Sequence, residues 1–419
     1  MISLRKLTRP LLAASMLAAA LVPAFPAGAQ APGDGPAKCV RGEAAGYPGK
    51  DLDRLAHVTL GAVEGGGVAD VWGWVDPETK NEYAVLSGSG GVRFFDVTKP
   101  TEPVYMGRMA GKVGTPLIWQ EIEILNDHAY IVCDLEPCGL QIFDLKRLGG
   151  VEAAVPVWRP DVVLPLGPYH SIASNPDTNH IFLNGNGAVV GSPAGTPLIL
   201  DVSQPLAPVP VGAMADDGYT HDSLCPTYKG VDKEFKGHEI CFNFNEDTIT
   251  TYDVTANPMQ PEQLSKVTYD TANYIHSGAL TKDQSYLIST DEGDEVANLS
   301  PSTLYIWDVR ELRDPKLVGT FVAKSMSIDH NVYSEGDALY HANYTNGFRI
   351  LDMARASRGK LKEVAWFDTM PVSDVADYDG VWAAYPYLPS GNILVGDMNG
   401  GMFILRPHDK VYRSLGVRR

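Results

Sequence analysis

Four histidines of this chain share one sequence context, because each stands at the head of an apolar segment. The segments read "PYHSIAS", "YTHDSLC", "YIHSGAL" and "IDHNVYS", and they contain His170, His221, His276 and His330. Neutral imidazole is a good ligand for Zn, Cu, Fe and Ni. Four imidazoles that meet at one point would therefore form a transition-metal site, provided that the fold brings these distant segments together.

A repeated phrase indicates the fold that could do so. In each copy an apolar strand ends in Asp and a polar turn follows, as in "VRFFDVTKP", "PLILDVSQP" and "LYIWDVREL". A seventh copy, "MFILRP", has Arg406 at the marker position, and the markers recur at intervals of 44 to 57 residues. The six acidic markers are Asp96, Asp144, Asp201, Asp253, Asp308 and Asp352. A period near 50 with about four short strands per unit is typical of β-propeller blades. We interpret the Asp as a turn former whose carboxylate accepts from the N–H two residues on.

The sequence therefore predicts an all-β protein with a single seven-bladed β-propeller at residues 57–407. The seventh copy stops after its third strand, whereas "HVTLGAV" at 57–63 is a spare strand near the start of the chain. We expect this N-terminal strand to close the ring as the outer strand of the last blade, which removes an exposed edge. Residues 30–56 are expected to form a lead segment, and 408–419 a short basic tail.

Counting back from each marker places the histidines at one structural position. His170, His221 and His276 lie 31, 32 and 32 residues before their markers, and His330 lies 22 residues before its own. The first strand of a propeller blade lines the central channel, so blades three to six would each turn one imidazole toward the axis. In the remaining blades the same count gives three other residues, Trp72, Gln120 and Trp382. Packing between blades is the favoured role for the two tryptophans, and walling a pocket is the alternative.

We predict a channel metal site formed by four histidines and one carboxylate, with a divalent Fe, Cu or Zn ion as the cofactor. The predicted ligands are His170, His221, His276, His330 and Glu121. Glu123 is a second carboxylate on the same strand as Glu121. Four neighbours of the histidines are expected to fix their tautomers, namely Ser171, Asp222, Asp329 and Asn331. The alternative is a hydrogen-bonded channel lining that holds water and no metal.

A second candidate is the acidic segment "STDEGDE", which places Asp291, Glu292, Asp294 and Glu295 within five positions. Ca²⁺ prefers hard oxygen ligands of this kind, so a calcium ion is a possible cofactor here. The segment lacks the full spacing of a known calcium-binding loop. A solvated acidic loop is the favoured alternative.

The N-terminus has the pattern of a secretory signal peptide. Arg5, Lys6 and Arg9 precede a short apolar run, and "AGA" at 27–29 resembles a cleavage signature. Residues 1–29 are thus expected to be removed after Ala29. No later run approaches the roughly 18 apolar residues of a membrane span. We expect a periplasmic or secreted protein with neither a membrane span nor an anchor.

Charge and cysteine content agree with that location. The formal net charge of −17 argues against nucleic acid and anionic membrane surfaces as partners. An oxidising compartment would allow disulfides within two close pairs, Cys225 with Cys241 and Cys133 with Cys138. Free thiols are the alternative for each pair, and Cys39 is left over.

Taken together, these motifs resemble the choice-of-anchor B family, which is built on LVIVD-type β-propeller repeats. The resemblance rests on "DVWGWVDPETKNEYAVLS", "VRFFDVTKPTEPVYMGRM", "DDGYTHDSLCPTYKG" and "EICFNFNEDTITTYDVT", and it covers about residues 39–407. It implies an exported propeller and no settled activity. Members often carry a second Cys after "GYP", where this chain has Gly49, so Cys39 lacks the partner that the resemblance implies.

Two classes of function follow from these observations. The first is a metal-dependent oxidoreductase or hydrolase that acts in the channel on an unidentified small molecule. The second is a non-catalytic propeller that binds an envelope protein or serves as a scaffold, with a stabilising ion as a variant of that role. Bound metal that is lost when a channel histidine is replaced would discriminate between them.

Overall fold

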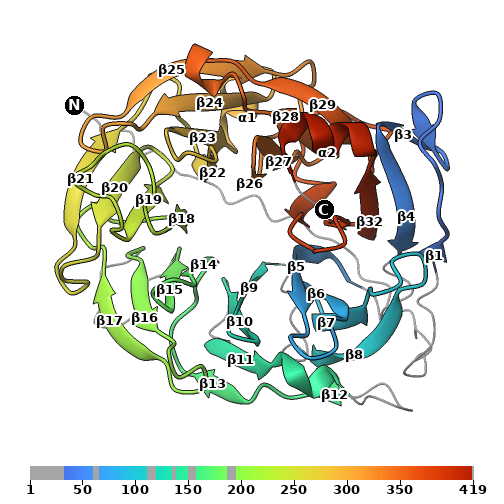
Figure 1. The fold of residues 1–419 in the computed structure, drawn as a ribbon, viewed down its shortest axis with the longest axis horizontal. Coiled ribbons are helices and arrows are strands. Elements are labelled where there is room, and N and C mark those ends of the chain that lie inside the picture. The colour runs from blue at the N-terminus through green and yellow to red at the C-terminus, as the bar shows by residue number, and fades with distance from the viewer. Residues whose placement is uncertain are drawn as a thin grey trace, which may run out of the picture.

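Seven sheets stand in a ring around a common centre in the computed structural model of the chain (Figure 1). The structure describes residues 33–59, 66–110, 119–134, 138–149, 157–185 and 195–417. The predicted all-β, seven-bladed propeller is confirmed. The predicted signal peptide at 1–29 lies outside the described residues.

In each blade four strands run in antiparallel order from the centre outward, and the innermost strands face one another across the ring (Figure 1). Blade one contains β5 (Val68–Val75), β6 (Glu82–Gly88), β7 (Gly91–Asp96) and β8 (Val104–Ala110). Blade two contains β9 (Gln120–Leu125), β10 (His128–Cys133), β11 (Leu140–Asp144) and β13 (Val162–Leu164). Blade three contains β14 (Ser171–Asn175), β15 (His180–Asn184), β16 (Leu198–Asp201) and β17 (Val209–Ala213). Blade four contains β18 (Asp222–Leu224), β19 (Ile240–Phe244), β20 (Ile249–Asp253) and β21 (Glu262–Val267).

The remaining three blades follow the same order, and short strands from elsewhere in the chain extend three of the sheets. Blade five contains β22 (Ile275–Leu280), β23 (Tyr286–Asp291), β24 (Thr303–Asp308) and β25 (Lys316–Val322). Blade six contains β26 (Val332–Glu335), β27 (Ala338–Ala342), β28 (Phe348–Asp352) and β29 (Lys362–Phe367). Blade seven contains β30 (Val381–Tyr385), β31 (Ile393–Asp397), β32 (Gly401–Pro407) and β4 (Leu52–Val58). The extending strands are β12 (Val157–Trp158) on blade one, β3 (Tyr47–Lys50) and β2 (Glu43–Ala44) on blade six, and β1 (Gly33–Asp34) on blade seven.

The six marker aspartates end the third strand of blades one to six, as the repeat predicted. Each carboxylate accepts a hydrogen bond from the backbone N–H two residues on, over 2.7–3.1 Å. The interpretation of the marker as a turn former is therefore confirmed. Because the turn fixes where the fourth strand begins, one short motif sets the boundary of each blade.

Blade seven takes its outer strand from the N-terminal part of the chain. β4 pairs antiparallel with β32, from Met402 opposite Val58 to Pro407 opposite Leu52. The strand begins five residues before the predicted range of 57–63, and residues 60–63 lie outside the described ones. Its earlier start has a physical reason. Leu52 is fully buried in the core, and the Asp53 carboxylate accepts from the side chain of Lys38 and the backbone of Cys39.

The C-terminal segment predicted as a basic tail contains a helix, α2 (Asp409–Leu415). Three of its side chains are buried, namely Val411, Tyr412 and Leu415. The Tyr412 hydroxyl donates to the main-chain oxygen of Gly391 in blade seven. The helix therefore covers the sheet that holds both ends of the propeller.

Two disulfides join the predicted pairs, Cys133 with Cys138 and Cys225 with Cys241. Cys39 is free and half-buried. Disulfides form and persist in oxidising environments, which agrees with an extracytoplasmic location. Among the described residues, no helix has both the length and the apolar character needed to cross a membrane.

Candidate metal centre

The four predicted histidines lie in an arc at the heads of four successive inner strands. His170 and His221 directly precede β14 and β18, His276 is the second residue of β22, and His330 lies two residues before β26. Neighbouring rings have centroid distances of 4.3, 4.1 and 4.3 Å along the arc. Residues more than 50 positions apart in sequence thus lie side by side, because the blades repeat one geometry.

Main-chain oxygens of the following blade fix the tautomer of two of these rings. Nδ1 of His221 lies 3.2 Å from the oxygen of His276, and Nδ1 of His330 lies 2.5 Å from the oxygen of Trp382. A carbonyl oxygen only accepts, so Nδ1 carries the proton in both rings. Nε2 of a neutral ring then has a free lone pair, as a metal ligand requires. Nδ1 of His170 lies 3.3 Å from a carboxylate oxygen of Asp134 instead.

The four side chains that were predicted to fix the tautomers make other contacts, so that prediction is wrong. Ser171 donates to the His221 oxygen and to Asp222, and Asn331 donates to the Trp382 oxygen. Asp329 accepts from Ser302 and from the backbone of Thr303. Side chains of successive strand residues point in opposite directions. The neighbours of a channel histidine consequently reach the adjoining backbone and not its ring.

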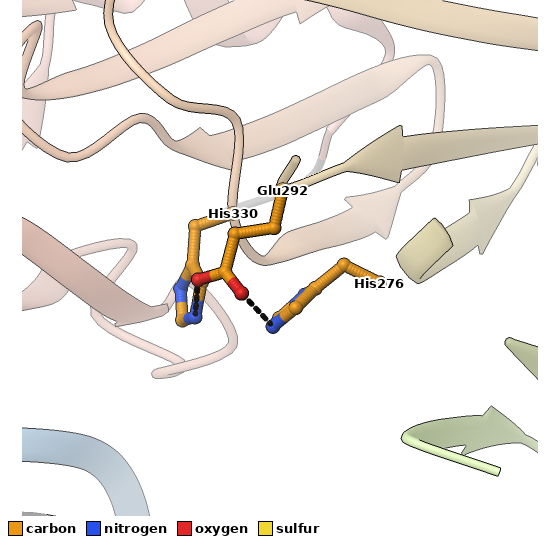
Figure 2. Close-up of side chains that lie close together, drawn as sticks. All are labelled: His276, Glu292 and His330. Atoms are coloured by element: carbon orange, nitrogen blue, oxygen red, sulfur yellow. Dashed lines mark ion pairs between the residues drawn. The ribbon is translucent and has the colours of Figure 1, made fainter. Parts of the chain in front are cut away.

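Two of the histidines converge on one carboxylate. Nε2 of His330 lies 3.6 Å from Oε1 of Glu292, and Nε2 of His276 lies 3.8 Å from Oε2 of the same residue (Figure 2). One ligand atom from each of the three side chains lies within 4.8 Å of the others. Two imidazoles and one carboxylate are the ligand set of catalytic zinc sites and of non-haem iron sites with open positions.

Burial keeps these imidazoles neutral. It lowers the pKa of His330 to about 3. The pKa values of His221 and His276 fall well below the usual range through burial and through the neighbouring imidazoles. Burial also raises the pKa of Glu292 to about 7, against a hydrogen bond from Tyr344 that lowers it. The group therefore offers neutral nitrogens and a carboxylate that ionises near neutral pH.

The arrangement of donors and acceptors fits a cation. The lone pair on Nε2 of His330 faces Oε1 of Glu292, which is an acceptor as well. Burying a polar group without a partner is costly. A metal ion among the three side chains would satisfy the acceptors that now face one another.

Glu121, the predicted fifth ligand, lies in a cavity of about 190 Å³ beside the histidines. Its lining includes residues that directly follow three of the channel histidines, Asp222, Ser277 and Asn331. Oε2 of Glu121 accepts from the backbone N–H of Ile172 at 3.1 Å. Glu121 belongs to the strand position next to that of the histidines, so its side chain points into this cavity and away from the group around Glu292.

Four carboxylates line the cavity, and each has a raised pKa. Burial raises the pKa of Asp70 to about 7, that of Glu123 to about 8 and that of Asp222 to about 6. The pKa of Glu121 is raised well above its usual range by burial and by the charges of Asp222 and Asp70. A raised pKa means that a carboxyl group keeps its proton to a higher pH than usual, so the cavity carries less negative charge near neutral pH than four ionised carboxylates would.

In blade one, the residue equivalent to the channel histidines is not the one that the sequence predicted. Oδ2 of Asp70 accepts from the Ile122 N–H at 2.9 Å, just as Glu121 accepts from the Ile172 N–H. Asp70 is thus equivalent to Glu121, and Ala69, not Trp72, lies at the histidine level. Trp72 is displaced because β5 and β6 have 8 and 7 residues, while β9 and β10 have 6 each. Trp72 lines the cavity.

The acidic segment is buried, so the interpretation as a solvated loop is wrong. Asp291, Asp294 and Glu295 are at most 1% exposed. Asp291 accepts from the Tyr269 hydroxyl and from three backbone N–H groups, and Asp294 accepts from the Tyr305 hydroxyl. Glu292 alone of the four faces the histidines. Calcium at this segment stays a prediction.

Sequence reasoning placed Glu292 with the acidic segment and did not connect it to the histidines. Tyr344, whose hydroxyl donates to Glu292 over 2.5 Å, was not singled out at all. Both residues follow second strands of their blades, where loop length varies between copies. Counting residues back from the marker Asp therefore could not locate Glu292 or Tyr344.

No protein-family model matches the chain, and a search of curated proteins found no match either.

Proposed function

We propose that the protein holds a divalent transition-metal ion, Fe, Cu or Zn, through His276, Glu292 and His330. The observation that carries the proposal is the 3.6 Å approach of His330 Nε2 to Glu292 Oε1. Both atoms are acceptors when the ring is neutral with its proton on Nδ1. Such a pair is stable in a buried site when a cation lies between the two atoms.

The proposed function is that of a metal-dependent hydrolase or oxidoreductase. Three protein ligands leave coordination positions open, which is the arrangement of catalytic rather than structural sites. A bound metal supplies Lewis acidity and lowers the pKa of a coordinated water. His221, neutral and 4.1 Å from His276 between ring centroids, is placed to accept a proton or to serve as a further ligand. His170 continues the arc toward Asp134.

Membership of the choice-of-anchor B family and a periplasmic or secreted location belong to the same proposal. The two disulfides support an oxidising compartment. The repeat of strand, aspartate and turn supports the family resemblance through the fold alone. Neither indicates which small molecule reaches the channel.

The test is metal analysis of untagged protein by plasma mass spectrometry, before and after reconstitution with Zn²⁺, Fe²⁺ or Cu²⁺. We expect about one equivalent of metal in the wild type. His276→Ala, His330→Ala and Glu292→Gln should each lose it while they keep the far-ultraviolet circular dichroism of the wild type. His128→Ala is the matched control, because His128 begins β10 and its Nδ1 contacts the Asn126 main chain.

A folded wild type that binds no metal after reconstitution would overturn the proposal. A metal that survives all three substitutions would overturn the assignment of its ligands. In the first case a binding or scaffold propeller becomes the better account of the function.

A further inference from the structure

The Tyr344 hydroxyl contacts the carboxylate that the two histidines share. It donates to Oε1 of Glu292 at 2.5 Å, and it is the one hydrogen-bond donor that the described residues offer to that carboxylate. Its ring also packs against His330, with 4.6 Å between ring centroids. Tyr344 is 1% exposed. One buried side chain therefore contacts both a ligand and the carboxylate beside it.

The backbone of Tyr344 is strained. Its φ is 31°, in the left-handed region that bulky side chains rarely adopt. Strain of this kind costs about 1–3 kcal/mol and persists where the surroundings over-determine it. An observed outlier of this sort points toward a functional constraint.

The surroundings of Tyr344 hold it in place on both sides. Its main-chain oxygen accepts from the N–H groups of Gly347 and Val381, at 2.9 and 3.0 Å. A Cβ on Gly380 would lie 2.3 Å from that oxygen, so blade seven approaches as closely as a glycine allows. Asn343 donates to Ile328 and Asp329, and Thr345 donates to Ser327 and Val375. The phenol is thus fixed by the fold before any metal binds.

We propose that Tyr344 is a positioning residue that orients Glu292 for metal binding. This inference rests on the proposed function. The hydrogen bond from the phenol to Oε1 fixes the carboxylate in the orientation in which Oε1 faces Nε2 of His330 and Oε2 faces Nε2 of His276. A carboxylate held by a fixed donor loses less side-chain freedom when it binds a metal, so the affinity is higher.

The experiment compares Tyr344→Phe with the wild type as full-length disulfide-bonded proteins. The probes are Zn²⁺, titrated against a chromophoric chelator, and Co²⁺, followed by its absorption spectrum. We expect Tyr344→Phe to weaken Zn²⁺ binding about 10- to 100-fold, the usual effect of removing a partner of a metal ligand, and to change the Co²⁺ bands. A general loss of stability would not alter the ligand geometry that these bands report.

Two tyrosines serve as controls. The Tyr130 hydroxyl is buried without a hydrogen-bond partner, and Tyr378 donates to the main chain of Glu292 and not to its carboxylate. Tyr130→Phe and Tyr378→Phe should keep wild-type affinity and spectrum. A crystal structure of metal-free Tyr344→Phe should show the Glu292 side chain turned from the orientation in Figure 2.

Wild-type Zn²⁺ affinity and an unchanged Co²⁺ spectrum in Tyr344→Phe would overturn this inference and leave the proposed function intact. A wild type that binds neither ion overturns both. If Tyr344→Phe melts at a lower temperature without metal yet binds Zn²⁺ as tightly as the wild type, Tyr344 is a structural residue only, and the inference is again wrong.

Discussion

Nδ1 of His180 lies 2.7 Å from Oε2 of Glu239, so a ring at the start of β15 in blade three pairs with a carboxylate just before β19 in blade four. Glu239 also accepts from Asn175 and Thr178. It is 3% exposed. These hydrogen bonds connect blade three to blade four, and they lie apart from the channel histidines.

The His180 pair makes stability depend on pH. The hydrogen bond that His180 donates to the Glu239 carboxylate raises the pKa of His180 above its usual 6.5. The folded state therefore binds the proton more tightly than the unfolded state. Stability from the pair is full below about pH 6.5 and is lost as pH rises through the raised pKa. We expect His180→Asn to cost most stability below that pH, with a shrinking difference above it, as measured by urea unfolding. A constant difference across pH would contradict this account.

Removal of the acidic partner should cost more. Glu239→Ala leaves the half-buried His180 imidazole and the side chains of Asn175 and Thr178 without their acceptor. We expect a loss of about 3 kcal/mol in the free energy of unfolding, since breaking a buried pair from one side is strongly destabilising. Glu234→Ala is a suitable control, because its carboxylate contacts Arg313 at the surface and surface pairs contribute about 0–1 kcal/mol.

Glu123 predicts a second pH effect. Burial raises its pKa from 4.5 to about 8, so the folded state prefers the protonated carboxyl. That stability is present below about pH 4.5 and is lost as pH rises through about 8. Glu123→Gln has no charge to bury. The stability of Glu123→Gln relative to the wild type should therefore increase between those two pH values and then level off. If the free energy of unfolding of Glu123→Gln differed from that of the wild type by the same amount at every pH, the carboxyl would not be buried in the folded state.

Metal binding should stabilise the protein by mass action. At a free metal concentration of 100 times Kd, a ligand specific for the folded state adds about 2.7 kcal/mol. We expect Zn²⁺ to raise the melting temperature of the wild type and to leave that of Glu292→Gln almost unchanged. Chelation with EDTA should reverse the increase. An equal increase in both proteins would place the ion elsewhere.

The marker aspartates allow a test of the blade boundaries. The Asp201 carboxylate accepts from the backbone and side chain of Ser203, and these bonds lower its pKa. We expect Asp201→Ala to lose about 1 kcal/mol of stability, the usual net value of a hydrogen bond. Asp201→Asn keeps an acceptor and should lose less. Thermal melts of both variants at pH 7 measure these losses. A lower melting temperature for Asp201→Asn than for Asp201→Ala would contradict this expectation.

The fold could be predicted from the sequence because its signal is local and repeated. A strand, an Asp and a turn recur in six of the seven blades, and the hydrogen bond from the Arg310 N–H to the Asp308 carboxylate is formed within two residues. The arc of histidines could be predicted for the same reason, since His221 and His276 occupy one position of a repeating unit. Because the blades are related by rotation about the channel axis, residues at the same position of neighbouring inner strands lie close together.

The remainder of the site depends on what differs between the blades. Glu292 reaches the histidines from a turn that precedes a short helix, α1 (Asp294–Asn298), within a longer connection of blade five. Trp72 was misplaced because extra residues in β5 and β6 shift the count. Glu121 lines the neighbouring cavity and is not among the three side chains around Glu292, because one step along a strand reverses the direction of a side chain. Packing sets the irregular lengths of strands and loops and the directions of side chains. Counting residues from a marker cannot reveal either.

The pairing of β4 with β32 has a consequence for how this protein comes into being. Blade seven needs residues from near both ends of the chain. β4 is made before the first strand of blade one, and its partner strand β32 is made only after the other six blades. Contacts between such distant segments slow folding. The ring thus stays open until β32 has been made, and a chain that ends before β32 has no native partner for β4, its first long strand.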